Sequence, residues 1–590
     1  MLNTNLRKLI QFKLIPWIKL AGTRNGYSSN ESKVKKRLIS LLTIGLIISG
    51  ISNIVLFNQL INISPAPSNS IFLHATNLIP TSLDPLNASD SGSKDVIHQV
   101  CEGLFAYDLR DLNLPRINHL AEQYFWENQT TLQIKIREGI NFHDGSQFNA
   151  LAVKWNLDRI NYFINATGNL PSNTPKAKLA SLFFLPDYIT PIINRTEVVK
   201  NFNITIYLNA PFSPLLNLFC HQACYMISPK SADATSYIQL DGDLVGTGPF
   251  MFNSYNKFPH WEGKIKFGEV KFTRWEGYWR NLPHFEELIF ILTDEEYGIG
   301  ADWYTNIAPW SWCCGEEPPE TITFKLFTAD TGIPDLSYYY LGLNNKIYNA
   351  TWRKAMCLAI NYSYVADFLK VNVISANSPI SPGFIAAYNL SAQTSYNITK
   401  ARTLMQSMGF GTGFTTDAEW IAVAESTSPF LSIPYTYNLG NEFREDLFTA
   451  IPEWFKLIGI EVQDDGVTWS QYINYLYYDR DHLGAFVQYM DLDCLDPYHM
   501  LNQLFNPNSD SNFAQVNDPW INTKLSLALN TSDEVSRNNI YKDIQGYITE
   551  TAFYHAPLLH RKLHFIHSAK IHNPIYNVLS LFEAYYMYRV

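Results

Sequence analysis

Short apolar runs and longer helical runs alternate along most of this chain. Residues 131–136 (TLQIKI) alternate apolar and polar side chains as a half-exposed strand does, and residues 71–75 (IFLHA) are typical of a buried strand. Residues 93–106 and 351–369 space their apolar side chains as amphipathic helices do, with Ser93 as the expected N-cap of the first. No repeat at solenoid periods is visible. This alternation of strands and helices predicts an α/β fold.

The N-terminal region is predicted to cross a membrane once. Residues 38–57 carry no charge, and a helix of about twenty residues spans a hydrocarbon core of ~30 Å. Basic residues precede this segment, and positively charged flanks stay in the cytoplasm. We therefore expect a basic cytoplasmic tail at 1–37, a transmembrane anchor at 38–58 and a linker at 59–70, with the remaining chain on the extracellular face.

A cleaved signal peptide is the alternative for the same segment. Signal peptides have a short positive region and end in a small-x-small cleavage site. Here the leading region is 37 residues long, and the Ser64-Pro65-Ala66-Pro67 stretch is a poor site. An uncleaved anchor is favoured. No cysteine closely follows the apolar segment, so a bacterial lipoprotein anchor is not expected.

Composition limits the class of protein. A chain of 590 residues exceeds the size at which one hydrophobic core stops growing, so two or more lobes are expected. Hydrophobic residues make up 46% and charged residues 17%, which is typical of a globular chain. The formal net charge of -10 disfavours nucleic acid as a partner, because phosphate binding needs concentrated Lys and Arg. Acidic side chains on a solvated surface are the simplest explanation of this negative net charge.

The cysteines and sequons fit an exterior location. Of seven cysteines, Cys220 and Cys224 are near enough for a local disulfide, and the odd total leaves at least one cysteine unpaired within the chain. Zinc binding by this pair with His221 is disfavoured, because no second ligand pair follows at a matching spacing. Asn-x-Ser/Thr sequons recur after the apolar segment and agree with a glycoprotein, although a chain rich in Asn, Ser and Thr contains many by chance.

No catalytic motif stands out. The chain lacks the serine-hydrolase, zinc-protease and phosphate-loop signatures, so no catalytic residues are assigned. A C-terminal group of histidines includes pairs spaced three or four residues apart, which could bind metal if the segment is helical. Metal binding is therefore left open as an alternative, and no metal site or cofactor is assigned. This group comprises His555, His560, His564, His567 and His572.

An ordered series of short motifs covers about 450 residues. Each motif is weak alone, but the joint order and spacing form a strong signal. In chain order they are Leu83-Asp84-Pro85, Glu102-Gly103-Leu104-Phe105 with Tyr107-Asp108, residues 132–137 with Gly139, Phe142-His143-Asp144-Gly145 with Phe148, Gly246-Thr247-Gly248-Pro249-Phe250, Tyr278-Trp279, Asn344, Arg353-Lys354-Ala355, Ala359-Ile360-Asn361, Asp493, and Asp496-Pro497-Tyr498.

This series resembles the extracytoplasmic solute-binding proteins of family 5, the oligopeptide- and dipeptide-binding receptors of ABC importers. The resemblance implies a two-lobed periplasmic-binding-protein type II fold with an inserted third subdomain, placed here after the N-terminal transmembrane helix. Mapped by the motifs, the expected boundaries are lobe I at 71–107, 228–325 and 562–590, the inserted subdomain at 108–227, and lobe II at 326–561.

The resemblance also implies where a ligand binds. Asp493 lies four residues before Pro497, where the peptide-binding relatives carry an Asp that pairs with the peptide α-ammonium. A ligand amine would offset the cost of partly burying this carboxylate. The alternative is a surface-loop Asp beside Asp491 and Asp496.

Two departures from the family pattern affect the expected site. Relatives commonly carry a Trp three residues before that Asp, where this chain has Met490 with Tyr489 adjacent. Dipeptide receptors hold the ligand carboxylate with an Arg in the segment aligned to residues 434–438, where the nearest position here is Asn438 and Arg444 follows six residues later. Tyr489 and Asn438 are therefore candidate ligand contacts, and a carboxylate clamp at this segment is in question.

Aromatic residues complete the candidate set. Trp310, Trp312 and the run 338–340, with Tyr339 at its centre, suit extended ligands of mixed polarity, and packing in a core is the alternative. Arg353 is expected to brace a helix or cap a carbonyl rather than to contact ligand.

The sequence thus predicts an extracellular receptor that is not an enzyme and needs no cofactor. It would capture an extended oligopeptide between two lobes and deliver it to an ABC permease with its ATPase subunits. The alternatives are a membrane-anchored sensory or surface protein of the same fold without a transport role, a receptor for a metal chelate or another solute, and an exported hydrolase.

Overall fold

The computed structural model describes most of the chain after residue 69. Residues 1–68 and 69–590 form two separate units, and every description below concerns the second. The described ranges are residues 70–76, 78–262, 265–293, 303–305, 326–368, 373–382, 384, 386–388, 396–492, 494–568 and 570–589. The predicted tail, membrane anchor and linker therefore lie outside the described residues. Within those ranges no helix has both the length and the apolar character needed to span a membrane.

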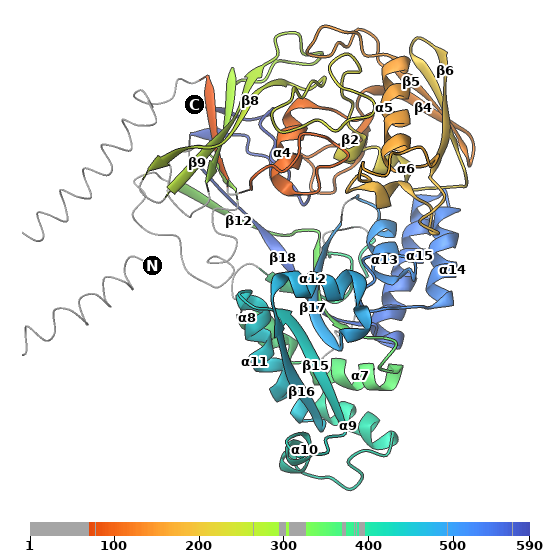
Figure 1. The fold of residues 1–590 in the computed structure, drawn as a ribbon, viewed down its shortest axis with the longest axis vertical. Coiled ribbons are helices and arrows are strands. Elements are labelled where there is room, and N and C mark those ends of the chain that lie inside the picture. Colours follow the sequence, from red (N-terminus) through yellow and green to blue (C-terminus); the bar gives the residue numbers. More distant parts are fainter. Residues whose placement is uncertain are drawn as a thin grey trace, which may run out of the picture. The chain divides into compact units, whose positions relative to one another are not determined.

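An upper group of strands, in the orientation of Figure 1, forms one end of a large sheet. Its strand order is β11-β1-β10-β9-β8, with β1 parallel to β10 and to β11, and β9 antiparallel to both of its neighbours. The strands are β1 (Ile71–Thr76), β8 (Phe250–Glu262), β9 (Ile265–Arg274), β10 (Glu287–Thr293) and β11 (Trp303–Thr305). Helix α4 (Ser91–Val100) packs against this sheet through Val96, Ile97 and Val100, which are fully buried.

A lower group of strands continues the same sheet. Its order is β16-β15-β17-β13, with β15 parallel to β16 and β17, and β13 antiparallel to β17. The strands are β13 (Ser337–Leu343), β15 (Leu431–Asn438), β16 (Ile460–Val467) and β17 (Ala485–Asp491). The helices on this side are α7 (Ala350–Ala359), α8 (Tyr362–Phe368), α9 (Ile398–Ser407), α10 (Asp417–Ala424), α11 (Glu442–Lys456) and α12 (Trp469–Tyr478).

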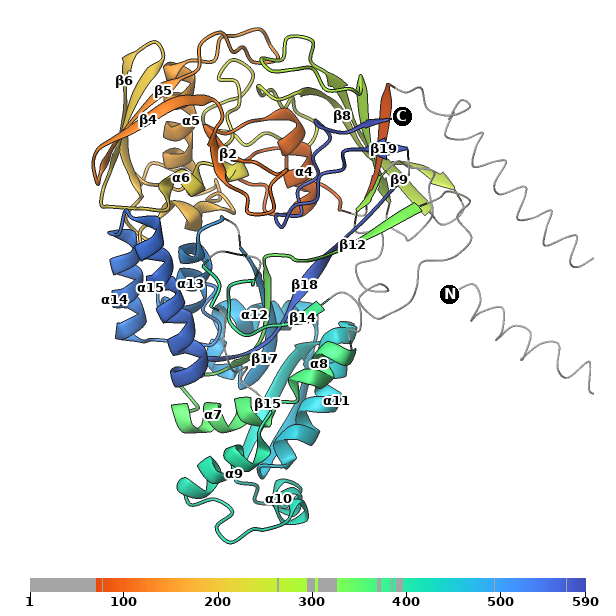
Figure 2. The ribbon, with the colours of Figure 1, turned by 180° about the vertical axis from the view of Figure 1, so that it is seen from behind.

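One long strand, β18 (His555–Ser568), belongs to both groups. Its first part pairs with β13 and with β14 (Val373–Ser375), and its second part pairs with β11 and with β12 (Leu326–Pro334). Figures 1 and 2 show β12 and β18 running between the upper and lower groups. These two crossing strands connect the halves of the molecule, which we call the upper and lower halves.

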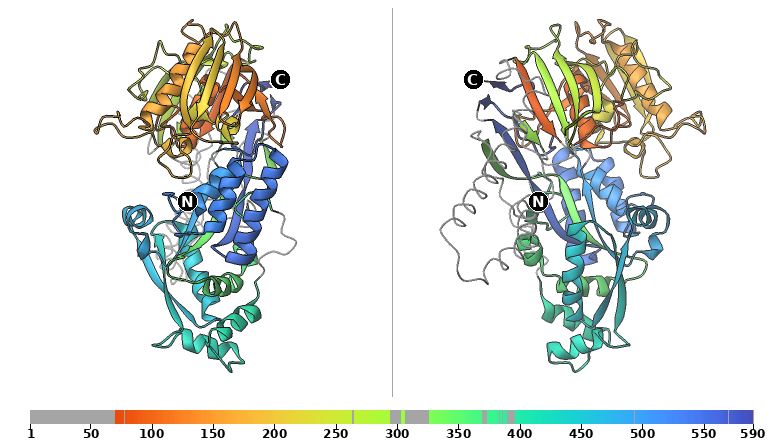
Figure 3. Two further views of the ribbon diagram at one scale, coloured as in Figure 1. Left: turned by 90° about the vertical axis from the view of Figure 1, so that its right-hand side faces the viewer. Right: turned by 60° about the vertical axis from the view of Figure 1, so that its left-hand side comes forward.

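A separate four-stranded antiparallel sheet lies beside the upper group, with the order β4-β5-β7-β6. Helix α5 covers it, and α13, α14 and α15 of the lower half lie directly beneath it in Figure 3. The elements are β4 (Ala121–Asn128), β5 (Thr131–Ile136), α5 (Ala150–Phe163), β6 (Ile193–Lys200), β7 (Asn203–Leu208), α13 (Pro497–Phe505), α14 (Pro519–Leu529) and α15 (Glu534–Gly546). The remaining short elements are β2 (Phe105–Tyr107), β3 (Arg116–Asn118), α6 (Leu215–Leu218), β19 (Ile571–His572), β20 (Tyr588–Arg589), 3-10 turns at Ala180–Phe183, Gln222–Cys224 and Arg480–His482, and a π-helical turn at Tyr547–Ala552.

The strand predictions at 71–75 and 131–136 are confirmed by β1 and β5. The helix predicted at 93–106 is wrong at both ends, because α4 is capped by the Asp90 side chain and ends at Cys101. The backbone of Glu102 pairs with Met226, and a Cβ at Gly103 would lie 2.8 Å from two carbonyl oxygens. A tertiary contact therefore ends this helix. The helix predicted at 351–369 is divided into α7 and α8 by the extended backbone of Ile360.

The cysteine prediction is also corrected. Cys220 and Cys224 are both buried free thiols, and the Cys220 Sγ–H donates to the carbonyl of Leu216 at 3.3 Å. Burial raises the pKa of both thiols well above the usual range, so both remain protonated. Arg353 behaves as predicted, donating to the backbone carbonyls of Phe553 and Ala552 at 3.1 and 3.0 Å.

Three buried histidines make the stability of the fold depend on pH. Burial lowers the pKa of His74 and His555 to about 3 and that of His560 to about 4. Each stays neutral in the folded chain over a range in which the unfolded chain, with a histidine pKa near 6.5, takes up a proton. Proton uptake by the unfolded state favours unfolding, so these groups lower stability as the pH falls from about 6.5 towards 4.

We expect His555→Phe to reduce this acid sensitivity. Phe keeps the stacking on Tyr340, where the ring centroids are 4.1 Å apart, and removes one titrating group. The free energy of unfolding would be measured by urea denaturation between pH 7 and pH 4.5. In the variant it should change with pH by up to about 1.4 kcal/mol per pH unit less than in the parent chain. The exposed His572→Phe change should leave the slope as in the parent chain. Equal slopes in the parent chain and in both variants would show that His555 does not contribute to the acid sensitivity.

Candidate functional site

A cavity of about 390 Å³ lies where the two halves meet. Part of its lining comes from the loop between β2 and β3, and part from the lower half near the start of α13 and α15. This volume is at the lower end of the range for pockets that enclose small organic ligands, roughly 300–1,000 Å³. The lining residues are Tyr107, Leu112, Asn113, Leu114, Pro115, Arg116, Asn217, Phe384, Leu495, Glu534 and Val578.

Asn217 links the two halves beside this cavity. Its Oδ1 accepts from Arg116 Nη1 at 2.6 Å, and its Nδ2 donates to the carbonyl of Leu495 at 3.1 Å. Further along the same contact, the Ser213 hydroxyl donates to the carbonyl of Leu529 at 2.7 Å. The halves therefore touch on this side, and the crossing strands β12 and β18 join them on another.

The end of β17 presents aromatic and charged side chains from the lower half. Tyr489 is 48% exposed, and its ring stacks on that of Tyr339 on β13 with 5.2 Å between centroids. Arg561 of β18 lies over Tyr339, 5.9 Å from its centroid. Asp491 Oδ1 is 3.6 Å from Arg561 Nη2, which is too long for a hydrogen bond. We call Tyr339, Tyr489, Asp491 and Arg561 the β17 wall.

The protein around Asp491 perturbs its carboxyl. Half of the side chain is exposed, yet the surrounding protein desolvates the carboxyl and raises its pKa. Arg561, at ion-pair distance, acts in the opposite direction. Perturbed pKa values are found both at binding sites and in structural ion pairs.

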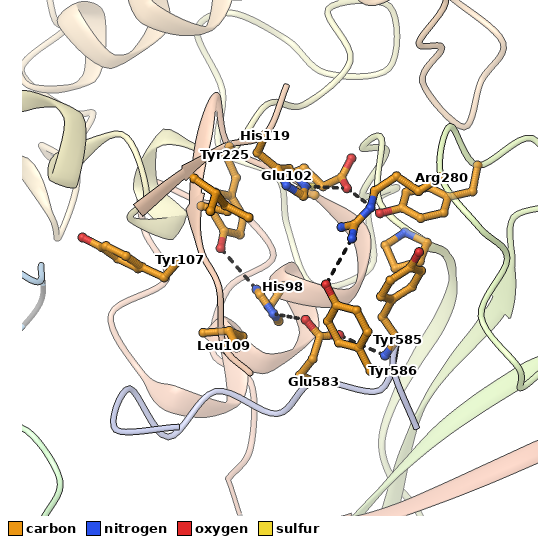
Figure 4. A pocket seen from close by; sticks show the side chains of 16 residues that line it. His98, Glu102, Tyr107, Leu109, His119, Tyr225, Arg280, Glu583, Tyr585 and Tyr586 are labelled. Atoms are coloured by element: carbon orange, nitrogen blue, oxygen red, sulfur yellow. Dashed lines mark hydrogen bonds and ion pairs between the residues drawn. The ribbon is translucent and has the colours of Figure 1, made fainter. Parts of the chain in front are cut away.

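A second, smaller pocket of about 60 Å³ adjoins the cavity at Tyr107 (Figure 4). Its central carboxylate, Glu102, is hydrogen-bond acceptor to four side chains. The donors are His119 at 2.8 Å, Tyr278 at 2.8 Å, Thr247 at 2.7 Å and Trp279 at 2.9 Å. Burial alone would raise the pKa of Glu102, but His119 and these hydrogen bonds hold it below the usual value.

The other acid of this pocket is also paired. Glu583 lies 3.2 Å from His98, whose other ring nitrogen contacts the Tyr225 hydroxyl at 3.2 Å (Figure 4). Burial lowers the pKa of His98, but the Glu583 carboxylate outweighs this and raises it. Because both carboxylates have their partners within the protein, this pocket is a polar part of the core beside the cavity. The β17 wall differs, since Asp491 has no hydrogen-bond donor among the described residues.

Comparison with known proteins identifies the chain. A model of the bacterial extracellular solute-binding proteins, family 5, matches residues 117–512. The chain belongs to this family. This family 5 protein is a solute-binding receptor of an ABC importer, and the family is non-catalytic. The resemblance drawn from the ordered motifs is confirmed.

Individual relatives agree with this assignment. The glutathione-binding protein GsiB of Pectobacterium atrosepticum is 28% identical over 482 residues, which cover 79% of this chain and 84% of that protein. DppA from Helicobacter pylori, solved with the peptide STSA, is 17% identical with a TM-score of 0.65, covering 88% of this chain and 98% of that one. NikA from Brucella suis, solved with Fe(III)-EDTA, is 19% identical with a TM-score of 0.67, covering 88% and 100%. The structural likenesses establish the α/β periplasmic-binding-protein fold.

Some of the predicted ligand contacts of this family 5 protein lie outside the described residues. These are Asp493, Trp310 and Trp312. Tyr489 and Tyr339 are described and stack on each other in the β17 wall. Asn438 is buried, and its Oδ1 accepts from Arg444, whose Nη2 also donates to Gln488 at 3.0 Å.

Two charged residues of this region were not singled out from the sequence. Arg561 of the β17 wall and its partner Asp335 come from segments far apart in the chain, and neither belongs to a motif. The C-terminal histidines do not lie on a helix, because His555–Ser568 form strand β18 and His572 lies in β19. Among the described residues no group of three or more His, Cys, Asp or Glu is placed to hold a metal ion.

We expect Glu102→Gln to destabilise the fold. The change removes the charge that pairs with His119 and places an NH₂ group against donors, so the expected loss is about 3 kcal/mol in urea denaturation. Glu122→Gln is the matched control, since its ion pair with Lys135 is exposed and should cost under about 1 kcal/mol. If the two variants were equally stable, Glu102 would have no structural role.

Proposed function

We propose that this receptor captures a short peptide-type solute with a free amine. Curated relatives such as GsiB of Pectobacterium atrosepticum are named glutathione-binding proteins, and DppA was solved with the peptide STSA. The single observation that carries the proposal is the state of Asp491 in the β17 wall. Half of its side chain is exposed, its carboxyl is partly desolvated, and no described residue donates a hydrogen bond to it. Arg561 lies at ion-pair distance from this carboxylate, and a ligand ammonium would add the hydrogen-bond donor that it lacks.

The size of the cavity supports a small ligand. A volume of about 390 Å³ fits a ligand of two to four residues better than a long extended chain. The residues that line this cavity do not include the β17 wall, where Tyr339 and Tyr489 offer aromatic faces for the apolar parts of a ligand. We propose Asp493, two residues after Asp491, as the main contact of the ligand α-ammonium, with Tyr489, Tyr339, Asn438, Trp310 and Trp312 as further contacts.

We also propose how the receptor is presented. The charge-free segment 38–58 would anchor it in the membrane, and the chain after residue 70 would meet an ABC permease and its ATPase subunits through both lobes. In this proposal residues 108–227 form a subdomain inserted in lobe I, and residues 326–561 form lobe II. A sensory or surface role without transport remains the alternative if no cognate permease exists.

Identifying the natural ligand tests the proposal directly. The full-length protein would be purified from its native host and denatured, and the released small molecules would be analysed by mass spectrometry. A peptide or a glutathione-like compound is the expected result. A sugar or a metal chelate as the bound compound would overturn the peptide assignment and leave the family assignment intact.

We expect Asp493→Ala to weaken the binding of a free-amine peptide by about 2 kcal/mol or more in titration calorimetry, because the ligand ammonium loses its partner. The N-acetylated form of the same peptide should bind both proteins equally. Asp510→Ala is the control, since the Asp510 side chain is 95% exposed and lies on another loop. Unchanged affinity of the variant for the free amine would remove Asp493 from the site.

A further inference from the structure

Arg116 is a positive charge in the cavity between the halves, and the described part of the protein does not neutralise it. Its Nη1 donates to Asn217 Oδ1 at 2.6 Å, and no described residue accepts a hydrogen bond from its Nε or Nη2. Glu534 is the carboxylate among the lining residues, and it forms no ion pair with Arg116 or with any other described residue. Arg116 therefore has guanidinium donors left for a group that enters the cavity.

A second arginine, in the loop that leads to Arg116, is paired within the protein. Arg110 Nε and Nη2 donate to the two carboxylate oxygens of Asp108, both at 2.8 Å. Arg110 does not line the cavity. The loop thus carries one arginine with its own carboxylate and one without, and the arginine without a carboxylate faces the cavity.

Asn217 fixes the position of the Arg116 guanidinium. Asn217 lies in α6, and its Nδ2 donates to the carbonyl of Leu495 in the lower half at 3.1 Å. The Tyr107 hydroxyl donates to the backbone carbonyl of Asn217 at 3.3 Å. The guanidinium is therefore held by a side chain that contacts the lower half. Donors fixed in this way lose less conformational freedom on binding a ligand than mobile ones.

Apolar side chains surround much of the remaining cavity. Leu114, Leu495 and Val578 line it and are buried. Leu112 also lines it, yet its side chain is 55% exposed. An apolar group in the cavity would cover Leu112, which is favourable by about 25 cal/mol for each Å² of apolar area removed from water.

We propose that Arg116 binds the C-terminal carboxylate of the solute, and that Leu112 and Leu114 contact an apolar side chain on the same terminal residue. The Nε and Nη2 edge of a guanidinium binds a carboxylate in a bidentate manner. This inference rests on the proposed capture of a short peptide in this cavity, and it does not depend on which residue holds the ligand amine. It names the class of peptide, which has a free C-terminus and an apolar last residue. Glu534 disfavours an acidic last residue, because like charges repel.

This assignment also accounts for a departure from the family pattern. Dipeptide receptors hold the ligand carboxylate with an Arg in the segment aligned to residues 434–438, where this chain has Asn438. The Oδ1 of Asn438 accepts from Arg444, so this position is occupied within the protein. Arg116 supplies the carboxylate partner from the upper half instead. Because Asn217 links Arg116 to the lower half, the carboxylate would lie beside a contact between the halves.

Three tetrapeptides test the two parts of the inference. Ser-Thr-Ser-Leu and its C-terminal amide differ only in the carboxylate, and Ser-Thr-Ser-Leu and Ser-Thr-Ser-Asp differ only in the last side chain. Titration calorimetry on the full-length protein should show at least about tenfold tighter binding of the free acid than of the amide, as expected for loss of one charge-assisted contact. The peptide ending in Leu should bind at least about tenfold tighter than the peptide ending in Asp, because only Leu buries apolar area in the cavity.

Variants then separate the contributions of the residues. Arg116→Gln should bind the acid and the amide with similar affinity, and Arg116→Lys should keep only part of the preference, because it keeps the charge without the planar fork. Leu112→Ala should weaken the preference for the last Leu and leave the ratio of acid to amide unchanged. Arg110→Gln is the matched control: it removes an arginine of the same loop whose charge Asp108 already pairs, so both ratios should stay as in the parent protein.

The possible failures are distinguishable. If the parent protein binds the acid and the amide equally, or if Arg116→Gln keeps the full preference, the carboxylate inference is wrong and peptide binding stands. If Arg110→Gln abolishes the preference as fully as Arg116→Gln, the loop acts as a whole and the assignment to Arg116 is wrong. If none of the three tetrapeptides binds although the compound released from the native protein is a peptide, this inference is wrong and the proposed function stands. A released sugar or metal chelate, with no tetrapeptide bound, overturns both.

Discussion

The hydrogen bonding of β18 to partners in both halves is the constraint on which the rest of this structure depends. A single strand pairs with β13 and β14 at one end and with β11 and β12 at the other, so the two sheets share a backbone. Asp335 and Arg561 reinforce the changeover with a backbone and a side-chain hydrogen bond. The backbone around Arg561 is therefore a point at which the two halves are joined.

The desolvated carboxylates of this molecule differ in whether the protein supplies their hydrogen-bond donors. Glu102 has four side-chain donors, and Asp84 is paired with the buried guanidinium of Arg159, so both carboxylates are fully satisfied within the upper half. Asp491 is desolvated without a hydrogen-bond donor among the described residues. A desolvated polar group without a hydrogen bond is costly unless a ligand supplies one, and this difference separates the proposed binding wall from the polar core around Glu102.

Sequence reasoning succeeded where local patterning decides the structure. The alternation in residues 131–136 gave β5 at the predicted bounds, and the ordered motifs identified the family before any fold was seen. It failed where distant segments meet. The helix predicted at 93–106 stops at Cys101 because Glu102 pairs with Met226, and Cys220 and Cys224 stay reduced within the core although they are four residues apart. Neither the pairing of Glu102 with Met226 nor the burial of the two thiols can be predicted from the neighbouring residues in the sequence.

The sequence by itself determined the α/β class, the family and the absence of a catalytic motif, and the segment around Asp493 stays a prediction of where a ligand binds. These follow from periodicity and from motifs short enough to be read along the chain. Only the tertiary structure brought Asp335, Asp491 and Arg561 close together, from the turn before β13, the end of β17 and the middle of β18. Whether a charge is satisfied depends on atoms within a few ångströms in space, and spacing along the chain does not encode that distance.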